Sequence, residues 1–186
     1  MGIEKKLDPD NWVDKYSDEL YRYTLTRVTY SNFAEDIVQE TFLSALRAKD
    51  SFKGEASEKN WLYTICKNKI IDHFRTQSKN LVKPSAAEEE IYFDKLGHWW
   101  EASTPNKWGL NYSQPIETKE FYNSLELCKN KLNAIQRSIF VMKYMEEIET
   151  ENICKILDIK PSNYWVIIHR CKLHLRSCLE KNWINI

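Results

Sequence analysis

The stretch from Asn80 to about Thr118 constrains the fold most, because it separates two halves that both show helical periodicity. Five helix-breaking residues interrupt it: Pro84, Gly97, Pro105, Gly109 and Pro115. Proline and glycine at this density prevent long regular structure. On both sides, apolar residues recur at helical spacing and strand signals are nearly absent. The sequence therefore predicts an all-α protein of two small helical domains joined by a linker that contains Trp and Pro.

We expect the domains at residues 1–80 and 119–186, with the linker at 81–118. A length of 186 residues is compatible with one domain or with two small ones, so the division depends on the composition of the linker. Trp99, Trp100 and Trp108 lie among polar residues there. These tryptophans either dock the linker at one point or cover the edge of a neighbouring domain of the same chain.

Three helices with short connectors are predicted in the first half: Asp10 to about Val28, Asn32 onward, and Ser57 to about Ser78. The second helix is expected to begin with Asn32 as its N-cap, because Glu35 follows at the spacing of a capping box. Ser57 is expected to cap the third helix after a loop at residues 50–55.

Helical patterns return in the second half: Phe121 to Leu132, Ala134 to Met145, Glu151 to Leu157, and about Ser162 to Asn182. Only residues 158–161 join the last two helices, and Asp158 stands where such a turn needs left-handed backbone. A short helix, a tight turn and a longer helix with a basic C-terminal half predict a helix-turn-helix. Helical hairpins that do not bind DNA show the same pattern.

The predicted second helix has an unusual polar side. Its apolar face collects Ala34, Ile37, Val38, Thr41, Ala45 and Leu46. A separate face collects Asp36, Gln39, Glu40 and Leu43. The acidic and amide groups fit a solvated surface, whereas an exposed leucine fits a protein interface. From these residues alone both interpretations stand.

The net charge is zero, since 27 Lys and Arg balance 27 Asp and Glu. A nucleic-acid partner would therefore be held by local patches. Two basic patches are visible: Lys67, Lys69, Arg75, Lys79 and Lys83 in the first, and Arg170, Lys172, Arg176 and Lys181 in the second. Their separation suggests two contact points on one polyanion.

The five cysteines are an odd number without a C-x-x-C pair. They predict reduced, buried thiols and argue against a disulfide framework or a zinc site. No run of about 18 apolar residues occurs, and the N-terminus has no apolar core, so we expect neither a membrane span nor a signal peptide. We expect a cytoplasmic protein with no metal and no cofactor.

The first half contains, in order, the motifs AEDIVQETFLSAL, FKG and NWLYTICKNKIIDHFR. The second half contains LNAIQRSIFVMKYMEEIETENICKILDIK. In order and spacing these segments resemble the two domains of extracytoplasmic-function (ECF) sigma factors of bacterial RNA polymerase, and the resemblance spans nearly the whole chain. The segment SNYWVIIHRCKLHLRSCLEKNWI is similar to a subgroup with a Trp-containing recognition helix.

This resemblance implies a subunit that binds core RNA polymerase, directs it to specific promoters and helps to melt the −10 region. The implied partners are core polymerase, through its β′ clamp helices and its β flap, promoter DNA and an anti-sigma factor, without membrane insertion. The positions that dock on the clamp helices in the family match Asp36, Gln39, Glu40 and Leu43.

The third helix and the loop before it match the family's −10 reader. The candidate residues are Phe52, Lys53, Trp61, Thr64, Asn68, Asp72 and Arg75. From Trp61 onward these residues recur at spacings of three and four and therefore share a face. An aromatic ring, an amide and a guanidinium on one face suit a strand that is being opened. Trp61 either contacts DNA or belongs to the core.

The predicted recognition helix matches the family's −35 reader. Its candidate residues are Ser162, Asn163, Trp165, His169, Arg170, Lys172 and Arg176. We expect the Asn163 amide to bind an adenine edge and the basic groups to bind phosphate. The first two turns are more apolar than is usual in the family, so Trp165 either contacts thymine methyl groups or is buried.

Two other classes of protein have weaker support in the sequence. An ordinary helix-turn-helix regulator that acts without polymerase explains only the C-terminal half. A metal-dependent enzyme would have to use His73, His98, His169 or His174. His169 and His174 do not share a helix face, and neither an H-E-x-x-H motif nor a P-loop is present. No catalytic residue is assigned.

Overall fold

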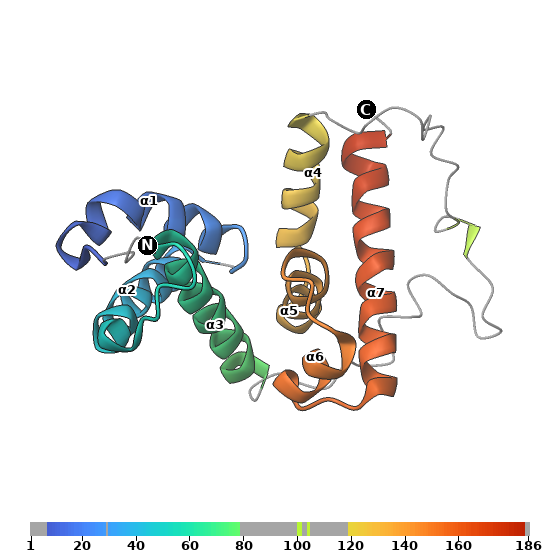
Figure 1. Cartoon of the computed structure of the whole chain (residues 1–186). Coiled ribbons are helices and arrows are strands. Elements are labelled where there is room, and N and C mark those ends of the chain that lie inside the picture. The colour runs from blue at the N-terminus through green and yellow to red at the C-terminus, as the bar shows by residue number, and fades with distance from the viewer. Residues whose placement is uncertain (1–6, 29, 79–99, 102–103, 105–118, 185–186) are drawn as a thin grey trace. The chain divides into compact units, whose positions relative to one another are not determined.

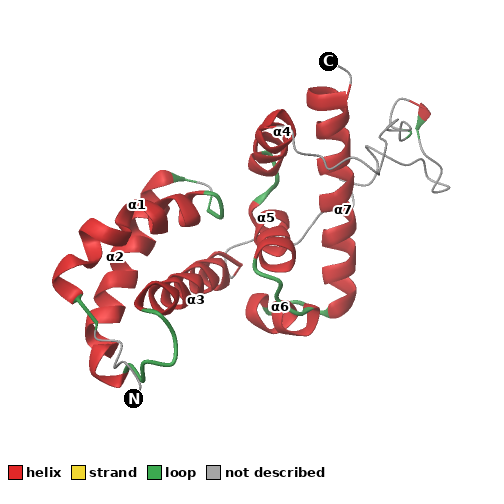
Figure 2. Ribbon diagram, turned by 45° about the horizontal axis from the view of Figure 1, so that its top comes forward, coloured by secondary structure: helices red, strands yellow, loops and turns green. Residues whose placement is uncertain are grey.

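The computed structural model describes residues 7–28, 30–78, 100–101, 104 and 119–184. The chain divides into two compact units, Met1–Thr76 and Gln77–Ile186. All regular structure in the described residues is helical (Figures 1 and 2). Most of the predicted linker, including Trp99, Trp108 and His98, lies outside the described residues, whereas Trp100 is described and half exposed.

The first unit contains the three predicted helices. They are α1 (Trp12–Leu25), α2 (Ser31–Ala48) and α3 (Glu58–Ser78), with short 3-10 turns at Pro9–Asn11 and Lys49–Ser51. The prediction for α3 is confirmed at its start, where the Ser57 hydroxyl accepts a hydrogen bond of 3.2 Å from the Asn60 amide. The predicted N-cap at Asn32 is wrong, because α2 begins at Ser31 and Tyr30 precedes it without a side-chain cap.

The core of the first unit is built from buried residues of all three helices, and α1 packs against α2. In α3 the buried residues recur every four positions: Leu62, Cys66, Ile70 and Phe74. In α2 Phe42 is buried, whereas Leu46, expected on the apolar face, is 43% exposed. The reason is helical drift, since each step of four residues turns the side chain by about 40° and Leu46 stands one such step beyond Phe42.

A carboxylate joins the start of α1 to the start of α3. Glu58 is the first residue of α3, and its Oε1 accepts hydrogen bonds of 2.6 Å from the Asp8 amide and from the Trp12 indole. Its Oε2 accepts a bond of 3.0 Å from the Tyr16 hydroxyl. A negative charge is also favourable at this end of a helix. These bonds position Trp12, which is fully buried.

The second unit consists of α4 (Lys119–Asn130), α5 (Ala134–Phe140), α6 (Thr150–Leu157) and α7 (Pro161–Leu179). Single π-helical segments continue α5 over Val141–Met145 and α7 over Glu180–Ile184. Figures 1 and 2 show α4 and α5 along one side of α7, and both helices contact it. The core includes Ile139, Met142, Ile153, Leu157, Tyr164, Ile167 and Cys171.

The turn between α6 and α7 has the predicted backbone. Asp158 is left-handed, with φ 53° and ψ 48°, and caps the C-terminus of α6. The Ile159 amide donates a 3.0 Å hydrogen bond to the Cys154 carbonyl, and Pro161 starts α7. Proline suits this first position because the N–H that it lacks would have no partner within the helix there. The helix-turn-helix prediction is confirmed.

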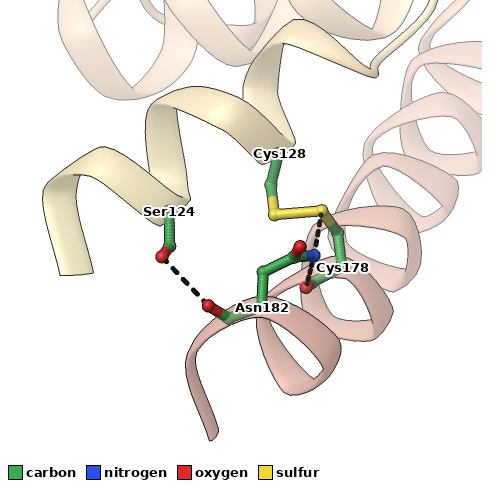
Figure 3. The surroundings of a disulfide bond; sticks show 4 residues. All are labelled: Ser124, Cys128, Cys178 and Asn182. Carbon is green, nitrogen blue, oxygen red and sulfur yellow. Dashed lines mark hydrogen bonds between the residues drawn. A yellow bond between two sulfur atoms is a disulfide. The ribbon is translucent and has the colours of Figure 1, made fainter. Parts of the chain in front are cut away.

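Two of the five cysteines depart from the prediction of reduced thiols. Cys128 of α4 and Cys178 at the end of α7 form a disulfide across 50 residues of sequence (Figure 3). Cys66, Cys154 and Cys171 are free and buried. The pairing escaped the sequence prediction because it depends on how α4 lies against α7, which residue spacing does not reveal.

None of the described helices combines the length and the apolar character that a membrane crossing requires. In the same part of the chain, no group of three or more His, Cys, Asp or Glu side chains is arranged to hold a metal ion.

Candidate protein and nucleic-acid interfaces

The acidic stripe of α2, defined by Asp36, Gln39, Glu40 and Leu43, is exposed along its whole length. Leu43 is 46% exposed, and Leu46 continues the apolar surface by almost one turn. Glu40 lies 3.3 Å from the ammonium of Lys69 on α3. This ion pair is solvent-exposed, so it contributes little to stability. The stripe therefore offers carboxylates around an apolar centre, which suits a basic, amphipathic partner helix.

The polar stripe of α3, defined by Thr64, Asn68, Asp72 and Arg75, is exposed opposite the buried face of that helix. The Asn68 amide makes no hydrogen bond with another described residue, so its donor and acceptor are both available to a base edge. Asp72 lies 2.6 Å from the Arg75 guanidinium. The Asp72 carboxylate thus partly neutralises the charge of Arg75, which weakens the attraction of this arginine for a phosphate.

Trp61 stands at the N-terminal end of this stripe, but it is only partly exposed. Its ring packs 5.1 Å from Phe52 and 5.9 Å from the buried Trp12. Between Phe52 and α3, Gly54 has a φ of +71°, a backbone conformation that favours glycine, and Lys53 is exposed. Trp61 therefore supports the loop from inside, and Lys53 is the cation that this part of the loop presents to solvent.

The outer face of α7 is exposed at Ser162, Asn163, Trp165, His169 and Lys172. Trp165 is 61% exposed, and its ring packs edge-on at 5.2 Å against the buried Tyr164. The alternative in which Trp165 belongs to the core is therefore wrong. Val166 is 40% exposed on the same face and was missed, because an apolar residue in an apolar run gives no sequence signal of exposure.

Two basic residues of α7 do not join this face. Arg170 is only 6% exposed, and this burial counts against the predicted phosphate contact. It follows Ile167 at a spacing of three and therefore turns toward the interior of the unit. Arg176 is 41% exposed, but its Nε donates a 3.0 Å hydrogen bond to Glu180. Lys172 is consequently the most available cation on the outer face of α7.

These features define a protein of two helical units, the first with two different exposed polar stripes and the second with a helix-turn-helix. Residues 12–80 match the family Sigma-70 region 2, and residues 122–175 match the family Sigma-70, region 4. A probable RNA polymerase sigma factor of Haemophilus influenzae is 31% identical over 97% of this chain and 94% of its own length. The ECF RNA polymerase sigma factor SigW of Bacillus subtilis is 30% identical over 95% and 92%, respectively.

The chain belongs to the sigma-70 family of RNA polymerase sigma factors and is of the ECF type. Among solved structures, the sigma factor RpoE of Bartonella quintana, in complex with the anti-sigma factor NepR, is 19% identical with a TM-score of 0.42. That similarity covers 92% of this chain and 96% of RpoE.

Proposed function

We propose that this ECF sigma factor binds core RNA polymerase through the acidic stripe of α2 and opens promoter DNA through the polar stripe of α3. The observation that carries the proposal is the exposure of both stripes on helices of one small unit. A protein interface explains why α2 keeps Leu43 and Leu46 in solvent beside carboxylates. A regulator that bound only duplex DNA would need neither stripe.

The α3 stripe suits a separated strand. Asn68 can bind the Watson–Crick edge of an unpaired base, and Thr64 lies one turn before it on the same face. Lys53 of the preceding loop and Arg75 add positive charge for the sugar-phosphate backbone. The unit therefore holds bases after they leave the stack, and this binding offsets part of the cost of unstacking.

The outer face of α7 suits the major groove of a −35 element. Asn163 can pair with an adenine edge, and Lys172 can bind phosphate. Trp165 and Val166 present apolar surface, which favours thymine methyl groups over cytosine. We propose that Ser162 and His169 complete this contact, because both are exposed on the same face.

Family membership also leads us to propose the β flap of the polymerase as a contact of the second unit, an anti-sigma factor as a regulatory partner, and the cytoplasm as the compartment of action. Catalysis of RNA synthesis belongs to the polymerase, which explains why no catalytic residue is assigned to this chain.

Replacing Leu43 with alanine should weaken binding to core polymerase by about 1 to 3 kcal/mol, because truncating an apolar anchor at an interface typically has this effect. The measurement is a titration of labelled protein with core enzyme. Leu25→Ala on α1 is the matched control, since Leu25 is also exposed and lies outside the acidic stripe. Equal affinity in the Leu43 and Leu25 variants would contradict the assignment of this face.

An ordinary helix-turn-helix regulator and a sigma factor should differ in how tightly the isolated chain binds duplex DNA. A sigma factor with zero net charge should bind duplex promoter weakly without polymerase and should lose that binding steeply with added salt. Tight, sequence-specific binding by the isolated chain would favour the regulator.

Asn68→Ala and Lys172→Ala should fail at different steps of initiation. Without the Asn68 amide, the polymerase complex should still form on duplex promoter, but strand opening should be impaired. A promoter with a pre-melted −10 segment should restore most of the activity, because the unstacking cost of a few kcal/mol is already removed. Without Lys172, closed complexes should weaken, and the salt slope of binding should fall by about one for the lost phosphate contact.

Permanganate footprinting of unpaired thymines measures opening, and titrations at several salt concentrations measure duplex binding. Thr76→Ala is a control for the first substitution, because Thr76 is an exposed polar residue near the end of α3 whose hydroxyl bonds to the Asp72 carbonyl. If Asn68→Ala and Lys172→Ala gave one common profile, the proposed division between the two units would be wrong.

A further inference from the structure

The disulfide between α4 and α7 lies at a cavity. The cavity has a volume of about 210 Å³ and is lined by both cysteines and by six further residues: Lys131, Leu132, His174, Ser177, Lys181 and Asn182. Cys128 is buried, whereas Cys178 is partly exposed. The amide of Asn182 donates hydrogen bonds to the carbonyl of Cys178 at 2.7 Å and to its sulfur at 3.4 Å (Figure 3). The cavity therefore lies beside the disulfide, and Cys178 is the more exposed of the two bonded residues.

The charge around this cavity is positive. Lys131 and Lys181 are exposed, His174 also lines the cavity, and none of the described residues that line it is acidic. Positive charge beside a sulfur raises the local concentration of thiolate anions and stabilises thiolates that form there. The other three cysteines lack such a setting, since all are buried, and burial raises the pKa of Cys171 to about 12.

We propose that the Cys128–Cys178 disulfide is a redox-active modification site that small anionic thiols reach through this cavity, and that its reduction releases α4 from the end of α7. That this release would regulate DNA binding rests on the proposed function, in which α7 is the helix that reads DNA and the protein acts together with polymerase. Disulfides are rare in the cytoplasm, where those that form are usually transient or redox-sensing.

The chemistry is thiol–disulfide exchange. The thiolate of the small thiol attacks the sulfur of Cys178, a new sulfur–sulfur bond forms, and Cys128 leaves as a thiolate that takes up a proton. A second molecule of the thiol attacks the mixed disulfide, which frees Cys178 and yields the oxidised dimer of the small thiol. Two electrons pass to the protein, and a disulfide oxidant such as oxidised glutathione reverses the reaction.

Reduction should loosen one end of the second unit without unfolding it. Near the disulfide, α4 is also held by the Ser124 hydroxyl, which donates a 3.3 Å hydrogen bond to the Asn182 carbonyl, and by Phe121, whose ring lies 4.9 Å from Trp183. Both contacts involve residues after α7 proper, in the π-helical segment. The rest of α7 keeps its packing against α5, so the change is confined to α4 and this segment.

The test compares three thiols of similar size and different charge on the native, oxidised protein: 2-mercaptoethanesulfonate, 2-mercaptoethanol and cysteamine. The rate of disulfide loss is measured by quenching with acid, alkylating the free thiols and determining the mass of the protein by mass spectrometry. Each rate is divided by the rate of the same thiol with an uncharged small disulfide, which removes differences in intrinsic reactivity. The anionic thiol should react at least about threefold faster than the cationic one at low salt, and the preference should vanish near 1 M salt.

The variant Lys131→Gln/Lys181→Gln should lose most of this preference, whereas Lys155→Gln/Lys160→Gln should keep it, because those exposed lysines do not line the cavity. Hydrogen exchange should then show faster exchange in α4 of the reduced protein and unchanged exchange in α6. Equal normalised rates for the three thiols, or a rate independent of thiol concentration, would overturn the proposal. The second result would mean that only the unfolded chain reacts.

These readouts need neither polymerase nor DNA, so they can succeed or fail independently of the proposed function. Repeating the promoter-binding titration with oxidised and reduced holoenzyme then asks whether the released helix alters DNA binding.

Discussion

Loss of the Cys128–Cys178 disulfide should lower the free energy of unfolding of the second unit by about 3 to 4 kcal/mol. The bond closes a loop of 50 residues, and a cross-link of that span mainly restricts the unfolded chain. The double substitution Cys128→Ala/Cys178→Ala is the direct test, because a single substitution would leave a thiol free to form other disulfides. Urea unfolding followed by circular dichroism should show a lower midpoint for the variant.

Wild-type protein measured with and without dithiothreitol provides the control for side-chain changes. Reduced wild type and the double variant should unfold at similar urea concentrations, whereas the variant should not respond to the reductant. Unfolding of oxidised and reduced wild type at one common midpoint would show that the cross-link does not stabilise this unit.

Glu58→Gln should destabilise the first unit by about 1 to 3 kcal/mol at neutral pH, because hydrogen bonds to a charged acceptor are stronger than those to a neutral one. The glutamine oxygen can still accept, but its NH2 group would face the donors from Asp8, Trp12 and Tyr16. Glu55→Gln is the matched control, since Glu55 is exposed in the loop and makes no hydrogen bond with another described residue.

The effect of Glu58 should depend on pH in a defined direction. Partial burial raises the pKa of this carboxyl, but the hydrogen bonds from Asp8, Trp12 and Tyr16 and the charge of Lys15 outweigh it, so the pKa lies below its ordinary value of 4.5. A carboxyl with a lowered pKa stabilises the folded state above about pH 4.5 and loses that contribution as the pH falls through its folded-state pKa. The stability difference between wild type and Glu58→Gln should therefore shrink between pH 5 and 3. A constant difference across this range would contradict the role assigned to Glu58.

Local patterns were sufficient for the helices and for the helix-turn-helix. Apolar residues at helical spacing predicted all seven α-helices of the described chain, and the αL conformation of Asp158 followed from the needs of a tight turn. The exposed stripes of α2 and α3 also emerged from periodicity, because side chains at spacings of three and four share a face. Periodicity does not locate the exact first residue of a helix, so the predicted cap at Asn32 is wrong, and the capping box of Asn133 and Gln136 at the start of α5 was not predicted.

Local sequence thus determines which segments are helical, where they turn and which groups each helix can present, since these properties depend on neighbours within a few residues. The packing of one helix on another decides which of those groups reach solvent. Arg170 and Trp165 show the difference, because composition favoured exposure of the arginine and left the tryptophan undecided, yet α7 buries Arg170 and exposes Trp165. The disulfide also depends on helix packing. Cys128 and Cys178 are distant in sequence, and their Cα atoms lie 5.7 Å apart only because α4 packs along α7.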